Sequence, residues 1–294
     1  MGILQLLING ISLGAVYAII AVGFAMVYSI LKFSNFAQGG IIGLTAYVAY
    51  FFHTAFKTPP SIVLTILIAC ISGTLIAMAV DALGFARVRK KNSPRVYYML
   101  ASVTLGMLIE SAVTVRFGQV TLGFPSVFSK NSFTIGALSL STRDMVILAV
   151  SVVLLVVLIL LIHKTKIGRA IRCVAIDPTT AKLMGINSAT VIRFTFMLAG
   201  CLAGIASVFL AMKYSVYPSL GSSMIFKGLV GSVIGGLGSL SGAIIGSFLL
   251  GIVEMLLVYY LGSSITPALV LGFMLVFLLV RPQGIAGSIA QDKA

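Results

Sequence analysis

Two glutamates stand where a carboxylate is costly. Glu110 lies in the middle of "LASVTLGMLIESAVTVRF" and Glu254 in the middle of "LLGIVEMLLVYY". A charged side chain at the centre of a bilayer costs about 3 kcal/mol, so such groups face the interior of a helix bundle, find a partner or stay protonated. Two interpretations stay open: a polar lining of a translocation path, or a structural contact such as a hydrogen bond between helices or an ion pair with Arg116 or Lys227.

Further chemistry is sparse in this chain. The candidates for a polar lining are the amides and carboxylates in or beside apolar runs: Asn9, Asn35, Gln38, Glu110 and Glu254. The glycines of 228–242 lack the Lys-Ser/Thr pair that completes a phosphate-binding loop, and neither an HExxH nor a GxSxG motif is present. The three cysteines, Cys70, Cys173 and Cys201, lack metal-ligand spacing. We therefore expect no enzyme activity, cofactor or metal site in this chain.

The composition requires lipid as part of the solvent. Of 294 residues, 60% are hydrophobic and 9% charged, and the mean hydropathy is +1.16. Soluble domains carry roughly 25% charged residues. The net charge of +14 is concentrated in two clusters, five Lys/Arg within "RVRKKNSPR" (87–95) and six between Lys164 and Arg193. Basic clusters between apolar runs follow the positive-inside rule, so we expect a membrane surface and not nucleic acid as partner.

The apolar runs predict a bundle of transmembrane helices. A helix needs about 20 apolar residues to cross the hydrocarbon core. Candidate spans cover residues 6–30, 36–55, 61–85, 97–117, 145–162, 192–212, 224–240, 243–261 and 265–280. With both basic clusters in the cytoplasm, nine crossings put the N-terminus outside and the C-terminus inside. The prediction is an all-α polytopic membrane protein of eight or nine transmembrane helices, with residues 1–294 forming one domain.

Two features of this pattern have more than one interpretation. The run 224–240 contains five glycines and one lysine. It is either a broken, re-entrant helix or a tightly packed helix that uses small residues. In addition, "GGIIGLTAYVAY" (39–50) resembles "SGAIIGSFLLGI" (241–252), which suggests a parallel internal repeat of the kind found in transporters.

A short soluble-looking helix is predicted in the loop 163–191, within "AIDPTTAKLMGIN" (175–187). Asp177 is a good N-cap, Pro178 suits the first helical position, and Gly185 suits the left-handed residue after a helix end. Upstream, Arg169 and Arg172 belong to a basic amphipathic segment that can lie at lipid headgroups. Such a helix is too short to be stable alone. It either docks on a soluble partner or packs against its own spans.

Several segments resemble the LivH-type permeases of bacterial branched-chain amino acid ABC importers. They are "NGISLGAVYAIIAVGFAMVYSILKFSNFAQGG", "GRAIRCVAIDPTTAKLMGIN", "FKGLVGSVIGGLGSLSGAIIGSFLLG" and "RPQGI" (281–285), in family order over nearly the whole chain. The resemblance implies a bacterial inner-membrane location and a set of partners. These are a second homologous permease, two ATP-binding cassette subunits that carry ATP and Mg²⁺, and a periplasmic or extracellular amino-acid-binding protein.

The resemblance also implies a role for the short helix, as the coupling helix that fits a groove on the ATP-binding subunit. Its residues are Asp177, Pro178, Thr179, Thr180, Ala181, Lys182, Leu183, Met184 and Gly185. Permeases of related importers for urea or sugars share this plan and are an alternative. An ion-driven secondary transporter or a channel is a further alternative, and an ion-driven carrier would have only Glu110 and Glu254 as an ionisable relay.

Overall fold

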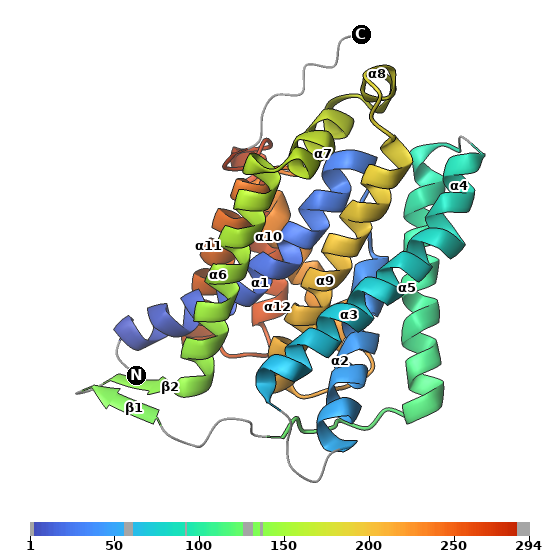
Figure 1. The fold of residues 1–294 in the computed structure, drawn as a ribbon. Coiled ribbons are helices and arrows are strands. Elements are labelled where there is room, and N and C mark those ends of the chain that lie inside the picture. Colours follow the sequence, from blue (N-terminus) through green and yellow to red (C-terminus); the bar gives the residue numbers. More distant parts are fainter. Residues whose placement is uncertain (1–2, 56–60, 92, 126–131, 136–137, 287–294) are drawn as a thin grey trace. The chain divides into compact units, whose positions relative to one another are not determined.

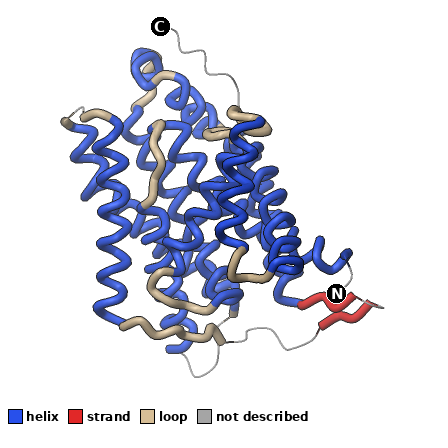
Figure 2. Tube along the Cα trace, turned by 180° about the vertical axis from the view of Figure 1, so that it is seen from behind, coloured by secondary structure: helices blue, strands red, loops and turns tan. Residues whose placement is uncertain are grey.

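A helix coincides with each of the nine predicted apolar spans. The computed structural model describes residues 3–55, 61–91, 93–125, 132–135 and 138–286. Helices account for nearly all of these residues, and strands are confined to one hairpin (Figures 1 and 2). The nine helices are α1 (Ile3–Leu31), α2 (Ala37–Ala55), α3 (Ile62–Val80), α5 (Arg95–Phe117), α6 (Thr142–Lys164), α9 (Ser188–Tyr214), α10 (Leu220–Gly235), α11 (Leu240–Leu261) and α12 (Thr266–Val280).

These helices differ in length and apolar character: six can span a bilayer, two are shorter apolar helices, and the 19-residue α2 belongs to neither group. Six helical stretches of the described chain are long and apolar enough to cross a bilayer: 4–31, 62–90, 95–117, 142–164, 188–214 and 240–261. Helices α10 and α12 are apolar but have 16 and 15 residues. At about 1.5 Å per residue they fall short of the roughly 30 Å hydrocarbon core. The chain is therefore a multi-pass membrane protein.

The prediction of an all-α fold is confirmed, and one connection adds a short hairpin that the sequence analysis did not foresee. The connection between α5 and α6 contains two antiparallel strands, β1 (Ser132–Ile135) and β2 (Leu138–Ser141), with Ser132 opposite Ser141. The sequence of both strands alternates polar and apolar residues, which is the strand period. The span predicted over 61–85 also changes character at its end, since α3 passes into a π-helical turn, η1 (Asp81–Phe85), and then into α4 (Ala86–Lys90).

The described chain forms two compact units that interleave along the sequence. Unit 1 comprises residues 1–25, 130–156 and 227–294, and unit 2 comprises residues 26–129 and 157–226. Three of the four boundaries fall inside the continuous helices α1, α6 and α10. The prediction of one domain over 1–294 stays a prediction, as does the parallel repeat, whose two copies begin near the starts of α2 in unit 2 and α11 in unit 1.

In unit 2, helices α3 and α9 approach closely through small residues. A Cβ placed on Gly73 would lie 3.0 Å from the Cα of Gly204, and a Cβ on Gly204 would meet the carbonyl of Ala69. Lipid tails are as apolar as leucine, so helices in a bilayer associate through close packing of this kind. The exposed faces of α3 and α5 instead carry large apolar residues such as Val63, Leu67, Leu100 and Leu108.

Residues 224–235 of the glycine-rich run are part of the unbroken helix α10. Helix α10 ends at Gly235, and Gly236 and Gly238 take positive φ values of 107° and 88° in the turn to α11. Across this turn, Gly235 contacts the backbone of Gly242. The close packing of small residues agrees with one of the two interpretations, and whether α10 crosses the membrane or is re-entrant stays a prediction. The helix ends at residue 235 and not at the predicted 240.

The C-terminal "RPQGI" segment completes the end of α10. The amides of Ile285 and Ala286 donate to the carbonyls of Ile234 and Gly235, both at 2.9 Å. These carbonyls lie in the last turn, where no intrahelical donor is available. The segment therefore satisfies backbone groups that would otherwise be orphaned in a packed region.

The α3–α9 contact predicts a strong effect of one added methyl group. Gly204→Ala should lower the free energy of unfolding by about 1–3 kcal/mol, because the new Cβ meets backbone that has no freedom to move aside. Gly272→Ala in α12, where nothing lies within 4 Å of the added atom, is the matched control. Thermal unfolding in detergent, followed by size-exclusion chromatography, measures both. Equal midpoints for the two variants would contradict the close packing.

Candidate functional site

The predicted short helix is present as α8 (Pro178–Leu183). The carboxylate of Asp177 accepts hydrogen bonds from the backbone N–H groups of Thr179 at 2.9 Å and Thr180 at 3.2 Å, and from the Thr180 hydroxyl. Pro178 occupies the first helical position. The cap therefore satisfies two of the amides that the start of a helix leaves free.

The other end of α8 is closed by a Schellman motif. The amide of Ile186 donates to the carbonyl of Ala181 at 3.0 Å, and that of Gly185 to Lys182 at 3.1 Å. Gly185 has φ = 80°, a left-handed conformation that is costly for a residue with a branched side chain. A six-residue helix is thus fixed at both ends by local hydrogen bonds.

Helix α8 is anchored to its neighbours through a small contact. It packs against α7 (Lys166–Ile176) and the start of α9. Ala181 is buried, and the hydroxyl of Ser188 donates to the carbonyl of Pro178 at 3.1 Å. Helix α7 buries Gly168, Ile171 and Val174 and exposes its basic residues Arg169 and Arg172, as an amphipathic helix does.

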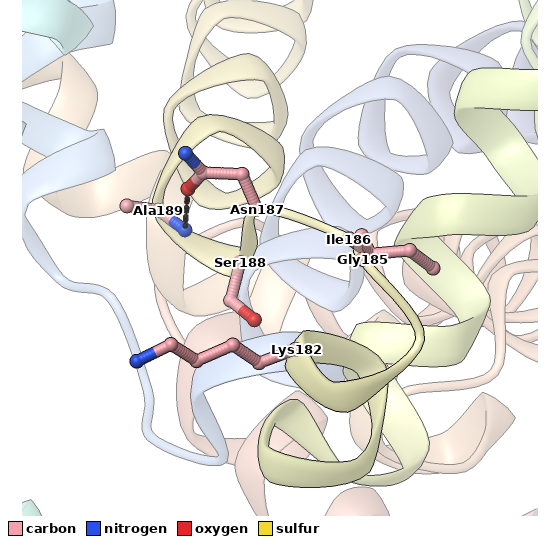
Figure 3. Close-up of a pocket in the computed structure, with 6 residues that line it drawn as sticks. All are labelled: Lys182, Gly185, Ile186, Asn187, Ser188 and Ala189. Carbon is pink, nitrogen blue, oxygen red and sulfur yellow. Dashed lines mark hydrogen bonds between the residues drawn. The ribbon is translucent and has the colours of Figure 1, made fainter.

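Large apolar side chains around α8 are left uncovered. Ile176, Leu183 and Met184 are 87%, 84% and 78% exposed, next to polar residues such as Asp177 and Lys182. Two hollows flank the helix. One, of about 440 Å³, is lined by Lys182 and residues 185–189 (Figure 3), and the other, of about 420 Å³, includes Ile176, Ala181 and Met184. An exposed apolar patch rimmed by polar residues is typical of a protein contact site.

Both basic clusters lie at the same end of unit 2. Helix α4, which carries the first cluster, and helices α7 and α8, which carry the second, are at one end of the unit's helices in Figure 1. The pattern that the sequence placed on one side of a membrane is therefore on one side of the unit. This arrangement agrees with the positive-inside rule.

Of the five path candidates, Glu254 has a clear partner. Its Oε1 lies 2.5 Å from the Nζ of Lys227, which also donates to the hydroxyl of Tyr17 at 2.9 Å. These residues come from α11, α10 and α1, and all belong to unit 1. The ion pair with Lys227 was one of two interpretations of Glu254 from the sequence. Tyr17 was not foreseen, because no sequence signal places it beside a residue 210 positions away.

The other four candidates have different surroundings. Glu110 is half-buried on α5 in unit 2, and no side-chain partner is found for it among the described residues, Arg116 included. Asn35 and Gln38 are buried in unit 2, whereas Asn9 is half-buried in unit 1. A role of these residues in a path stays a prediction.

Sequence reasoning missed two side-chain pairs in unit 2. Arg89 donates to both carboxylate oxygens of Asp81, at 2.6 and 2.9 Å, across the π-helical turn. The free thiols of Cys70 and Cys201, which are 131 residues apart, face each other between α3 and α9. The first pair could have been predicted from the sequence, because Asp81 and Arg89 are only eight residues apart. The second depends wholly on how α3 crosses α9.

Comparison with known proteins defines first the fold and then the family. The described helices share their fold with PsaBC from Streptococcus pneumoniae, solved in complex with Fab: the match covers 96% of this chain and 93% of that one, with a TM-score of 0.51 and 16% identity. The family model "Branched-chain amino acid transport system / permease component" matches residues 6–279. The chain belongs to this family.

Relatives of similar length support the assignment. The high-affinity branched-chain amino acid transport system permease protein LivH of Salmonella typhimurium is 31% identical, and BraD of Pseudomonas aeruginosa, with the same description, is 30% identical. Each match covers 99% of this chain and 97% of the relative. A probable LivH of Methanocaldococcus jannaschii is 30% identical over 92% of this chain and 88% of its own.

The cap on α8 predicts a pH-dependent helix. Hydrogen bonds from the Thr180 side chain and the Thr179 backbone hold the pKa of Asp177 below its ordinary value. The stability that the carboxylate adds is therefore complete above the ordinary aspartate pKa and is lost as the pH falls through the lowered one. Amide hydrogen exchange at Thr179 and Thr180, corrected for intrinsic rates, should stay slow from neutral pH to pH 5.

Substitution of the cap provides the corresponding test. Asp177→Ala should speed exchange at these two amides at pH 7, whereas Lys182→Ala, on the same helix but outside the cap, should leave them unchanged. Unaltered exchange in Asp177→Ala would show that α8 does not depend on its cap.

Proposed function

We propose that this chain is the permease subunit of an ATP-driven importer for branched-chain amino acids, worked through α8. The observation that carries the proposal is the rigidly capped helix with Ile176, Leu183 and Met184 exposed beside it. The family match supplies the transport system and the substrate class. The working unit contains a second homologous permease, two ATP-binding cassette subunits that hold ATP and Mg²⁺, and a binding protein that delivers the amino acid.

Helix α8 is suited to transmit motion because both of its connections are short. It follows α7 through Asp177 alone and leads to α9 through residues 184–187. A displacement of α8 by the ATP-binding subunits therefore moves α7 and the start of α9 with it. The exposed apolar residues provide the contact, and the caps keep the helix from unravelling under load. Switching of this kind requires packed elements with two discrete arrangements.

The proposed topology has nine crossings, with the N-terminus outside and the C-terminus in the cytoplasm. The common end of α4, α7 and α8 supports a single cytoplasmic surface for both basic clusters. The short helices α10 and α12 both cross in this topology, and the end of α10 is covered by backbone hydrogen bonds from residues 285–286. The bacterial inner membrane is the proposed location.

Two alternatives are less well supported. An importer for urea or a sugar has the same plan, but the relatives over nearly the full chain are named for branched-chain amino acids. An ion-driven carrier needs a titratable relay, and Glu254 is already paired with Lys227.

Loss of both caps tests the coupling role. Asp177→Ala with Gly185→Val removes the N-cap and strains the C-cap, so α8 should lose its fixed form while the spans remain inserted. In vesicles containing the full complex, leucine uptake per ATP hydrolysed should fall about tenfold or more, the loss expected when the one mechanical contact is broken. Gly272→Ala in α12, where nothing lies within 4 Å of the added atom, is the control. Full uptake per ATP in the double variant would exclude α8 as the coupling element.

The proposed topology has its own test. Lys182→Cys, in a chain whose three native cysteines are replaced by serine, should resist a membrane-impermeant maleimide in intact cells and react after the membrane is opened. Labelling in intact cells would place α8 on the outer side and overturn the proposal.

A further inference from the structure

The ion pair between Lys227 and Glu254 lies in otherwise apolar helices. Lys227 is the single charged residue of α10, and Glu254 that of α11. Keeping two charges in such surroundings is costly, and well-packed apolar residues of similar size often stabilise a fold as well as a buried ion pair does. A charged pair at this position therefore calls for a role besides stability.

The bonding of the Glu254 carboxylate is incomplete. Glu254 uses Oε1 for Lys227, and its buried Oε2 has no hydrogen-bond partner among the described residues. The Lys227 side chain is 21% exposed and that of Glu254 is 8% exposed. A carboxylate has about four acceptor positions. Glu254 thus has acceptor capacity to spare, and Lys227 is the more exposed member of the pair.

The ion pair between Arg89 and Asp81 provides a comparison, because both carboxylate oxygens are bonded there. In unit 2, Arg89 binds both oxygens of Asp81 in a fork. A bidentate guanidinium holds a carboxylate in one fixed geometry, whereas an ammonium acts as a point charge that changes partners readily. Of the two pairs, only Lys227–Glu254 has the chemistry of an exchangeable contact.

We propose that Lys227 and Glu254 form a transient binding site for the charged head of the transported amino acid. The substrate carboxylate takes the place of Glu254 on the Lys227 ammonium, and the substrate ammonium takes the place of Lys227 on the Glu254 carboxylate. No proton is transferred, and the pair closes again when the substrate leaves. This inference rests on the proposed function and adds the residues that receive the zwitterion.

Charge complementarity makes the exchange selective yet weak. An α-amino acid carries one ammonium and one carboxylate on the same carbon, so it matches a pair of opposite charges and keeps the site neutral overall. A carboxylic acid or an amine alone matches one half and leaves the other charge unpaired. Because the substrate must displace an existing ion pair, its net binding is modest, as passage through the membrane requires. Tyr17 keeps Lys227 in position throughout, through its hydroxyl.

Neutralising the pair tests this inference. In vesicles containing the full complex, Lys227→Met with Glu254→Gln keeps the shape of both side chains and leaves no unpaired charge. Leucine uptake per ATP hydrolysed should fall by about tenfold or more, the loss expected for one charge-assisted contact. The matched control neutralises the closed pair, Asp81→Asn with Arg89→Met, and should keep the ratio of the unaltered complex. An unchanged ratio in the Lys227/Glu254 variant overturns the inference.

A second measurement applies to the unaltered complex and decides alone if the variant fails to assemble. Reductive methylation of Lys227 is measured by mass spectrometry relative to methylation of Lys90, an exposed residue outside α8. This ratio corrects for the reagent that the ligands consume. Leucine should protect Lys227 several-fold better than 4-methylpentanoate or 3-methylbutylamine, which each carry one of its two charges. Equal protection by all three compounds, or none by leucine, overturns the inference.

Failure of the inference is distinguishable from failure of the proposed function. Leucine uptake by the unaltered complex tests the proposed function, whereas the comparison of variants and the protection of Lys227 test the ion pair alone.

Discussion

The hydrocarbon core of a bilayer cannot form hydrogen bonds with the protein backbone, and this constraint explains most features of this structure. Backbone groups must be satisfied within the chain, so the apolar runs become helices. Helices surrounded by lipid gain nothing from hiding apolar side chains and associate by approaching closely. Glycine and alanine therefore gather where helices cross, as at Gly73 and Gly204 in unit 2 and at Gly235 and Gly242 in unit 1. Large apolar residues are left on the outer faces.

The same constraint explains why α8 looks unlike every other helix. It lies in a loop between two long helices, where water competes for its backbone, and six residues are far too few for a helix to persist alone. Its stability comes from Asp177 and Gly185 at its ends and from the small buried contact of Ala181. A helix held in this way keeps its outer surface free. That is the property a docking element needs.

Charges inside or near the spans are few, and their geometry separates two purposes. Asp81 and Arg89 close a fork across a π-helical turn, which fixes the end of α3 where it passes into the basic α4. Lys227 and Glu254 join α10 to α11 through one oxygen and one nitrogen. A fork resists exchange, and a single point contact permits it. The two pairs thus illustrate how similar charges serve either rigidity or recognition.

The sequence by itself determined the helices and the caps of α8. Helix positions depend on local hydropathy, and capping depends on residues within a few positions. Both can therefore be predicted from short segments of the sequence. Contacts between distant residues were decided only by the tertiary structure. Lys227 contacts Tyr17 and Glu254 because α10 packs against α1 and α11 at these residues. Cys70 contacts Cys201 because α3 packs against α9 at these residues. The sequence of an apolar helix does not indicate which other helix it packs against, because its side chains are equally well accommodated by lipid and by leucine. The hairpin between α5 and α6 was missed for a related reason. Polar and apolar residues alternate over only four positions in each strand, and the sequence does not show that these two segments pair with each other.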